Sequence, residues 1–417
     1  MSIGAVVLGH WNLAVLGFTD GAFTGKNLLE LNPDLQIVTW LFQVMPLFFI
    51  VGGFTNATSW TSSRERGLTY GGWLAARAAR LIRPALWFVA FWTLLPVVAV
   101  SAGVLSAGVA RIGGQEVALP LWFLAVYLIA VAAIPGLFAL YRRVGIWLTV
   151  GLSAGAFVVD NLRFGLDVRS IGFANIAFVW GAVISLGFAW SDGTLTRTAR
   201  TAWAMACGGL LSLVVLVAFF DYPVSMIDLT HAPRSNAQPP SLALLTLAIA
   251  QCGVMLLFQR PANRWLERPR AWLAVVVANS MVMTFYLWNM SAVVLAAVLL
   301  FPTGIWPQPE VLSTAWWWLR LGWIAVCAIC IVPFLLAFRW AERPAPAPSR
   351  TPEVLVVLGT IAAAAGFGLL AVHAFPIPGP VPGDALALPA IGVALVAASA
   401  LLVRVDPLGP RRRPTEP

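Results

Sequence analysis

Apolar runs that are long enough to cross a lipid bilayer recur along almost the whole chain, and no other feature limits its fold as strongly. Hydrophobic residues make up 60% of the 417 positions and charged residues only 10%, whereas soluble domains carry about 25% charged residues. Lipid offers the backbone no hydrogen-bond partners, so a spanning segment has to satisfy its own polar groups, most simply as a helix. The sequence therefore predicts an all-α polytopic membrane protein.

Twelve apolar stretches are candidate transmembrane helices, because a span needs about 20 mostly apolar residues. They lie near residues 2–18, 35–57, 84–109, 119–140, 144–160, 171–189, 201–220, 241–258, 275–301, 314–338, 353–373 and 385–404. We expect 271–301 to be a single helix with an interfacial start. The first 18 residues have no basic leader and no small-residue cleavage site, so we expect a retained helix rather than a signal peptide.

The basic residues orient these helices. With the N-terminus in the cytoplasm, 20 of the 26 basic residues fall in cytoplasmic segments, as the positive-inside rule favours. They are Arg64, Arg66, Arg77, Arg80, Arg83, Arg142, Arg143, Arg197, Arg200, Arg260, Arg264, Arg268, Arg270, Arg339, Arg343, Arg350, Arg404, Arg411, Arg412 and Arg413. We therefore interpret the net charge of +9 as a topology signal and not as a nucleic-acid-binding surface.

The same pattern predicts the location and the domain organisation. Both termini are expected in the cytoplasm, and the excess of Arg over Lys is typical of a bacterium with GC-rich DNA, which predicts the plasma (inner) membrane. We predict a ten-span core over 1–340, a Pro-rich linker over 341–352, two additional transmembrane helices over 353–404, and a basic cytoplasmic tail over 405–417.

His10 is the first candidate for chemistry, because it lies within the apolar run "VVLGHWNLAVLGF". Ionisable residues inside a membrane are functional candidates by default, and imidazole titrates near neutral pH, as proton transfer or nucleophilic catalysis requires. A hydrogen bond between helices is the structural alternative. No carboxylate lies well inside a span, which disfavours a proton-coupled transporter.

A second candidate is the stripe formed by Arg77, Arg80 and Arg83, which recur every third residue and lie near one side of a helix. We expect Pro84 to mark the entry to the next span. Guanidinium groups match phosphate oxygens, so this stripe is predicted to bind a nucleotide-bearing donor such as coenzyme A. Anchoring at the cytoplasmic surface is the alternative.

A third candidate is a set of polar residues predicted to bind an acceptor. Asn279, Tyr286 and Asn289 fall at i, i+7 and i+10, which places them on one side of a helix. Gln43 precedes the glycine pair Gly52–Gly53 and completes the predicted set. A hydrogen-bond network between helices is the alternative. No residue pattern predicts a metal site.

Five motifs occur in a recognisable order over residues 1–340: "VVLGHW", "PLFFIVGGF", "RAARLIRP", "LWFLAVYL" and "FYLWNM". Together they resemble the acyltransferase-3 family of integral membrane acyltransferases. Three departures stand out. Only nine residues precede His10, where the family usually carries an Arg; Gly52 takes the place of a Ser; and Asn289 takes the place of the usual His.

The resemblance implies transfer of an acyl group, often acetyl, from cytoplasmic acyl-CoA to a hydroxyl of a carbohydrate, a lipid or a secondary metabolite. It implies that His10 is the catalytic histidine and that Arg77 and Arg80 contact the donor. We expect His10 to act as a general base, with a covalent acyl-histidine as the variant. Because an amide cannot titrate, Asn289 is predicted to have a positioning role. The expected partners are acyl-CoA, a hydroxylated acceptor and membrane lipids.

Two other functions stay open from the sequence. A transporter or flippase for a lipid-linked sugar would keep the polar helix face and the glycine-rich span, but would not need His10 as a base. A catalytically inactive homologue acting in envelope assembly is compatible with Asn289 in place of histidine.

Overall fold

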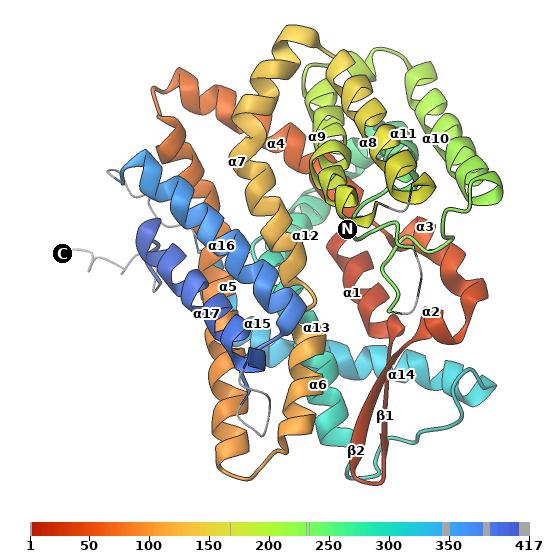
Figure 1. The fold of residues 1–417 in the computed structure, drawn as a ribbon, viewed down its shortest axis with the longest axis vertical. Helices are drawn as coiled ribbons and strands as arrows, with labels where there is room; N and C mark the ends of the chain where they lie inside the picture. The colour runs from red at the N-terminus through yellow and green to blue at the C-terminus, as the bar shows by residue number, and fades with distance from the viewer. Residues whose placement is uncertain are drawn as a thin grey trace. The chain divides into compact units, whose positions relative to one another are not determined.

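The structure is a computed structural model, and it describes residues 2–166, 168–230, 232, 234–343, 351–377 and 384–407. Over these ranges the regular elements are helices, apart from one two-stranded antiparallel sheet and an isolated bridge (Figure 1). The residues group into two compact units. The first unit comprises Met1–Val6, Leu29–Leu68 and Ala133–Val275, and the second comprises Val7–Leu28, Thr69–Ala132 and Val276–Pro417.

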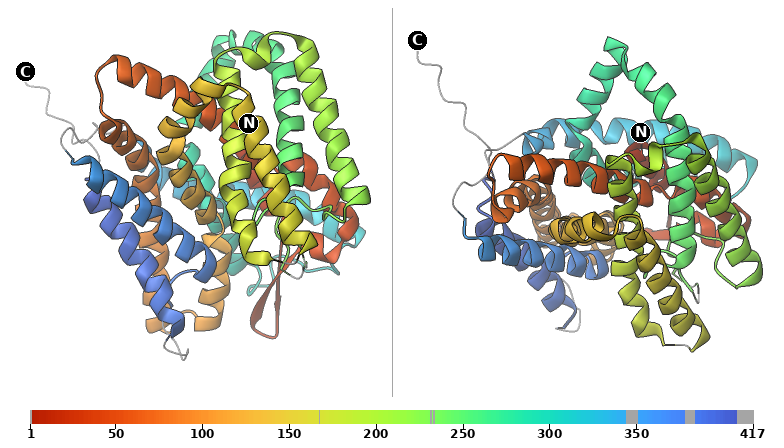
Figure 2. Two further views of the ribbon diagram at one scale, coloured as in Figure 1. Left: turned by 45° about the horizontal axis from the view of Figure 1, so that its top comes forward. Right: turned by 90° about the horizontal axis from the view of Figure 1, so that it is seen from above.

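The first unit is built from helices that pack through small residues. Its elements include η1 (Pro33–Val38), α3 (Thr39–Phe42), α4 (Met45–Glu65), α8 (Trp147–Gly165), η2 (Arg169–Ala174), α9 (Asn175–Ser191), η3 (Thr194–Thr196), α10 (Ala199–Phe219) and α11 (Leu242–Leu266). A Cβ added to Gly53 would lie 2.3 Å from the Ile184 carbonyl oxygen, so only glycine lets α4 approach α9 this closely. Helices α10 and α11 form a second closely packed pair (Figure 2).

The second unit contains the hairpin and the C-terminal helices. Its elements include most of α1 (Ser2–Leu13), β1 (Ala14–Thr19), β2 (Ala22–Asn27), α5 (Tyr70–Ser101), α6 (Ala107–Ala118), α13 (Val282–Leu300), α14 (Thr314–Cys330), α15 (Val332–Phe338), η4 (Arg339–Glu342), α16 (Glu353–His373) and α17 (Asp384–Leu402). Helices α16 and α17 lie side by side, and both pack against α5 (Figure 1). The division between the units falls within α1, α2 (Leu28–Leu31), α7 (Leu121–Val144) and α12 (Pro269–Asn279).

Nine helical segments among the described residues are long and apolar enough to cross a membrane. They are Pro33–Glu65, Tyr70–Ser101, Ala107–Val144, Ser170–Ser191, Ala199–Phe219, Leu242–Leu266, Val282–Leu300, Thr314–Glu342 and Glu353–His373. The chain is thus a multi-pass membrane protein, whereas the predicted count of twelve spans is not confirmed. Ile3–Leu13 and Leu386–Leu402 are apolar but shorter. The predicted fifth span corresponds to α8, which carries Asp160 and Arg163 in its last turns.

The predicted first helix over 2–18 is wrong in its second half. Helix α1 ends at Leu13, and β1 and β2 then form an antiparallel hairpin in which Thr19 pairs with Ala22. The two residues between the strands, Asp20 and Gly21, both have positive φ, at 52° and 77°. Asp-Gly is a strong signal for a two-residue hairpin turn of this kind. The apolar composition of β1 concealed that signal.

Two other predicted boundaries are also wrong. Helix α5 begins at Tyr70, where the Thr69 side chain accepts a hydrogen bond from the Gly72 amide, and it runs through Pro84 rather than starting there. The single helix expected over 271–301 is interrupted between α12 and α13. At the interruption the Ser280 hydroxyl donates to the Val277 carbonyl oxygen, the local side-chain bond by which serine competes with helix continuation.

The Pro-rich linker and the basic tail are only partly covered by the structure. Residues 344–350 of the linker, with Arg350, and residues 408–417 of the tail, with Arg411, Arg412 and Arg413, lie outside the described residues. The beginning of the linker is described and is packed rather than free: Ala341 is buried, and Glu342 lies in η4 and accepts several hydrogen bonds.

Candidate active site

The second unit brings His10 and Asn289 together, although 278 residues separate them along the chain. His10 lies in the last turn of α1 and is half-buried, and Asn289 lies in the middle of α13 and is fully buried. The His10 Nδ1 and Asn289 Oδ1 atoms are 3.0 Å apart. The two residues that the sequence singled out for catalysis and for positioning are therefore direct hydrogen-bond partners.

The surroundings of Asn289 fix which way its amide points. Its Nδ2 donates to the Tyr286 carbonyl oxygen, 2.5 Å away, and a carbonyl can only accept. The Oδ1 atom must therefore face His10, and an oxygen acceptor requires that His10 Nδ1 carries the hydrogen. In neutral His10, the Nε2 atom then holds a lone pair and is the basic position of the ring.

Two further contacts hold this pair in place. Next to His10, the Trp11 indole Nε1 donates to the Asn289 carbonyl oxygen at 3.0 Å, so α1 is tied to α13 through both the side chain and the backbone of one residue. Beside Asn289, Trp288 is almost completely buried. Its ring is surrounded by rings of α5 and α15, namely Phe88, Phe91, Phe334 and Phe338. The helix that presents Asn289 is consequently fixed on both sides of that residue.

The beginning of α13 is capped by a carboxylate from a distant part of the chain. Met281, at the helix N-cap, makes no side-chain capping bond. Instead Glu342 accepts from the Met283 amide at 3.1 Å, and from the amide and the hydroxyl of Thr284, both at 2.5 Å. A negative charge at a helix N-terminus is favourable, because the first amides have no partner within the helix. Glu342 thus positions the helix that carries Asn289.

The three arginines of the predicted donor stripe lie on α5 and have different surroundings. Arg83 is buried, and its guanidinium donates to the carbonyl oxygens of Trp340, Ala341 and Arg343. Arg77 is half-buried and Arg80 is exposed. The guanidinium of Arg83 is therefore used in hydrogen bonds to the segment around η4. Arg77 and Arg80 are the members of the stripe that could contact a ligand.

The structure does not bring the predicted acceptor-binding set together. Asn279 ends α12 and is exposed, on a different helix from Asn289, so the predicted shared helix face is wrong. Tyr286 is buried on α13 and donates to the Pro120 carbonyl oxygen at 3.0 Å. Gln43 belongs to the first unit, where its Nε2 donates to the Met226 carbonyl oxygen at 2.7 Å.

Sequence reasoning did not single out Trp11, Glu342 or the aromatic residues around Trp288. Glu342 could have been noticed from the sequence, because it is an acidic residue shortly after a long apolar run that ends at Phe338. Its contact with the beginning of α13 joins distant segments of the chain and cannot be recognised in a single sequence. In the described part of the chain, no group of three or more His, Cys, Asp or Glu side chains is arranged to hold a metal ion.

Comparison with known proteins identifies the family of the chain. The acyltransferase-3 family, whose model is described as an acyltransferase domain, matches residues 1–338. The match covers most of the chain and includes both His10 and Asn289, so the protein belongs to this family. Its class is therefore that of a membrane acyltransferase. No curated protein and no solved structure matches the chain.

Proposed function

We propose that this protein transfers an acyl group, most simply acetyl, from cytoplasmic acyl-CoA to a hydroxyl group of a carbohydrate, a lipid or a secondary metabolite. The observation that carries the proposal is the hydrogen bond between His10 and Asn289, which leaves the Nε2 atom of His10 as a base. An acyl transfer to a hydroxyl needs such a base, because a neutral hydroxyl is a weak nucleophile at physiological pH.

The proposed reaction uses His10 in two roles. Its Nε2 takes the proton from the acceptor hydroxyl while the hydroxyl oxygen attacks the thioester carbonyl carbon. The tetrahedral intermediate then collapses, the carbon–sulfur bond breaks, and the coenzyme A sulfur leaves as a thiolate. The imidazolium returns its proton to that sulfur, so the products are an ester and a free thiol. Asn289 keeps the ring in one tautomer and orientation, as the asparagine does in cysteine proteases with a Cys-His-Asn arrangement.

The donor is proposed to bind through its phosphate groups. Arg77 and Arg80 lie on α5, one half-buried and one exposed, and neither is committed to backbone carbonyls in the way that Arg83 is. Guanidinium groups are suited to phosphate oxygens. The positive-inside rule supports a topology in which this end of α5 and both termini face the cytoplasm. The excess of Arg over Lys supports the bacterial plasma membrane as the location.

A transfer assay with the full chain in detergent micelles tests the proposal. The donor is acetyl-CoA with a labelled acetyl group, and the acceptors are a panel of sugars and glycerolipids with free hydroxyls. Two readouts are needed: release of free thiol, and label recovered in an alkali-labile ester. We expect both to rise together with at least one acceptor. Folded protein that releases no thiol from acetyl-, propionyl- or palmitoyl-CoA with any acceptor would contradict the proposal.

A further inference from the structure

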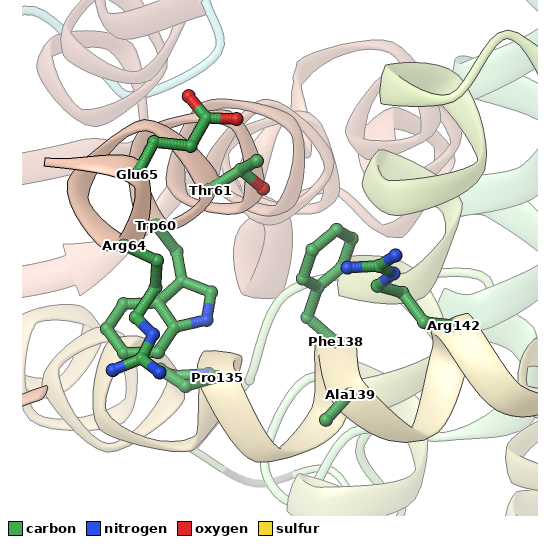
Figure 3. Close-up of a pocket in the computed structure, with 8 residues that line it drawn as sticks. All are labelled: Trp60, Thr61, Arg64, Glu65, Pro135, Phe138, Ala139 and Arg142. Carbon is green, nitrogen blue, oxygen red and sulfur yellow. The ribbon is translucent and has the colours of Figure 1, made fainter. Parts of the chain in front are cut away.

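A separate pocket of about 340 Å³ lies within the first unit, at the ends of α4 and α7. It is lined by Trp60, Thr61, Arg64, Glu65, Pro135, Phe138, Ala139 and Arg142. Arg64 and Arg142 flank the pocket from two sides, and the rings of Trp60 and Phe138 lie between them (Figure 3). The pocket therefore combines two cations with aromatic walls.

The charges in this pocket are not neutralised by the protein. Glu65 is its single acidic lining residue, and within the described residues no ion pair joins Arg64 or Arg142 to a carboxylate. Arg64 lies 5.6 Å from the centre of the Trp60 ring, a cation–π contact that orients the guanidinium without using its N–H donors. Both arginines are exposed and can accept a ligand.

Ordinary helix electrostatics explain only part of this arrangement. Each arginine lies in the last turn of its helix, where a cation complements the partial negative charge of the free carbonyl groups. That effect accounts for each arginine separately. It does not account for two helices directing their arginines to one aromatic-lined pocket. Arg66 and Arg143, which are their exposed neighbours, do not line it.

We propose that this pocket binds a phosphate group carried by an amphipathic ligand. Two guanidiniums are suited to phosphate oxygens, and the rings of Trp60 and Phe138 provide an apolar surface beside the phosphate. A phospholipid headgroup and the nucleotide part of the acyl donor share this chemistry. The proposal does not depend on acyl transfer, since its site lies in the first unit and the His10–Asn289 pair lies in the second.

The position of the pocket favours a phospholipid as the source. Arg64 is next to the end of the candidate span Pro33–Glu65, and Arg142 is two residues before the end of Ala107–Val144. The ends of spans lie at the depth of the lipid headgroups, where Trp and Arg are enriched. Anionic headgroups attract clustered basic residues at this surface.

Binding of phosphatidylglycerol to the full chain tests the proposal. Diacylglycerol with the same acyl chains is the matched ligand control, because it lacks only the phosphate headgroup. Native mass spectrometry of the protein in detergent gives the apparent Kd of each lipid. The pocket variant is Arg64→Gln with Arg142→Gln. The control variant is Arg66→Gln with Arg143→Gln, which removes the same charge from neighbouring exposed positions.

We expect the pocket variant to raise the Kd for phosphatidylglycerol by about tenfold or more, and the control variant by less than about twofold. Diacylglycerol binding should not change. Equal weakening of phosphatidylglycerol binding in both variants would overturn the proposal. Folding is checked by the melting temperature without lipid, and Arg142→Lys provides a milder variant, which keeps the charge and removes the planar guanidinium.

A second arm distinguishes the two sources of phosphate. Adenosine 3′,5′-bisphosphate, which carries phosphates like those of coenzyme A, is measured against adenosine with the same variants. If the pocket variant binds this nucleotide more weakly than the wild type but binds phosphatidylglycerol equally well, the pocket is a phosphate site for the acyl donor. No selective weakening for either ligand overturns the proposal.

Discussion

Asp160, which is buried in the first unit, and His10, which is half-buried in the second, differ in how many of their hydrogen-bonding positions are used within the protein. The Asp160 carboxylate is 1% exposed and accepts from Asn175 Nδ2 at 2.7 Å, from the Tyr222 hydroxyl at 3.0 Å and from the Leu242 amide at 2.7 Å. Burial raises the pKa of Tyr222, so it donates as a neutral phenol. These three donors occupy three of the roughly four acceptor positions that a carboxylate offers.

His10 uses one of its ring nitrogens and keeps the other. Its Nδ1 is bonded to Asn289, while no hydrogen bond to its Nε2 occurs within the described residues. We therefore expect that the burial of an ionisable group does not by itself identify a reactive site in this protein. Among the described residues, the Asp160 carboxylate accepts only from groups of its own unit, as expected of a group that stabilises the fold. His10 is bonded at Nδ1, and its Nε2 is the atom that we propose to react.

The largest effect is expected for His10→Ala. Removing a general base costs about 10²- to 10⁴-fold in rate, so turnover should fall by this factor while the protein still inserts into the membrane and binds donor. The matched control is Asn12→Ala on the same helix, whose amide bonds only to the Leu8 carbonyl oxygen of its own helix. Turnover is measured together with membrane abundance. Near-normal turnover at normal abundance would exclude His10 as the base.

A smaller loss is expected for Asn289→Leu, which leaves His10 in place and removes its partner. Without the acceptor on Nδ1 the ring loses its fixed tautomer and orientation, and we expect kcat to fall by about 10- to 100-fold, below the full general-base effect. The leucine also leaves the Tyr286 carbonyl without its Asn289 donor. An unchanged kcat in folded protein would show that the pair is structural.

The pH profile of the wild-type protein tests whether His10 is the only titrating group of the reaction. An amide does not titrate, so the rate should rise with pH in one limb as His10 loses its proton. Asn289→His restores the residue that the family usually carries and is expected to add a second ionisation. Two limbs arising from protein groups in the wild type would mean that His10 is not the only titrating group of the reaction.

The third effect concerns the donor. Arg77→Gln combined with Arg80→Gln should raise the KM for acyl-CoA by about tenfold or more, since hydrogen bonds to charged groups contribute about 1.5–3 kcal/mol each. The KM for the acceptor should change little. Arg83→Gln, on the same helix, should instead lower the melting temperature, because it removes donors from buried carbonyl groups. A KM change confined to the acceptor would refute donor binding by this stripe.

The family, the helical membrane class and the two central residues could be predicted from the sequence. Composition determines the class of protein. His10 and Asn289 can be recognised in the sequence because each is a polar residue within an apolar run. Hydropathy also located most spans, since an apolar run has few other stable arrangements in lipid.

The boundaries and the partners could not be predicted in the same way. Hydropathy does not distinguish an apolar strand from the end of an apolar helix, so β1 was assigned to a longer α1. The predicted helix face of the acceptor-binding set is wrong for a related reason. The i, i+7, i+10 spacing places residues on one side only in an unbroken helix, and the helix is interrupted after Asn279. The bonds from Arg83 and Glu342 to their partners depend on contacts between distant segments, which local pattern does not carry.

The fourth effect is expected for Glu342→Gln. The amide of glutamine supplies one acceptor, whereas the carboxylate accepts from both the Met283 and the Thr284 amides. The beginning of α13 should therefore loosen, and kcat should fall by about two- to tenfold, the range of a weakened helix cap of about 0.5–1.5 kcal/mol. The fall in kcat should exceed any change in the KM for acyl-CoA, because Glu342 positions α13, although its charge also acts on Arg80. Glu267→Gln, at an exposed position, is the control.

The smallest effect on turnover is expected for Asp160→Asn, and it tests the comparison itself. The carboxylate oxygens accept from three donors, and an amide nitrogen in place of one oxygen would face at least one of them. An unsatisfied buried group costs about 1–3 kcal/mol, so the melting temperature should fall. Turnover per folded molecule should stay within about twofold of the wild type, because Asp160 lies in the first unit and has no role in the proposed reaction. Asp228→Asn, at an exposed position, is the control and should change neither quantity. A loss of turnover in Asp160→Asn without a loss of stability would show that the first unit also contributes to chemistry, and that satisfied hydrogen bonds do not separate structural from reactive groups in this protein.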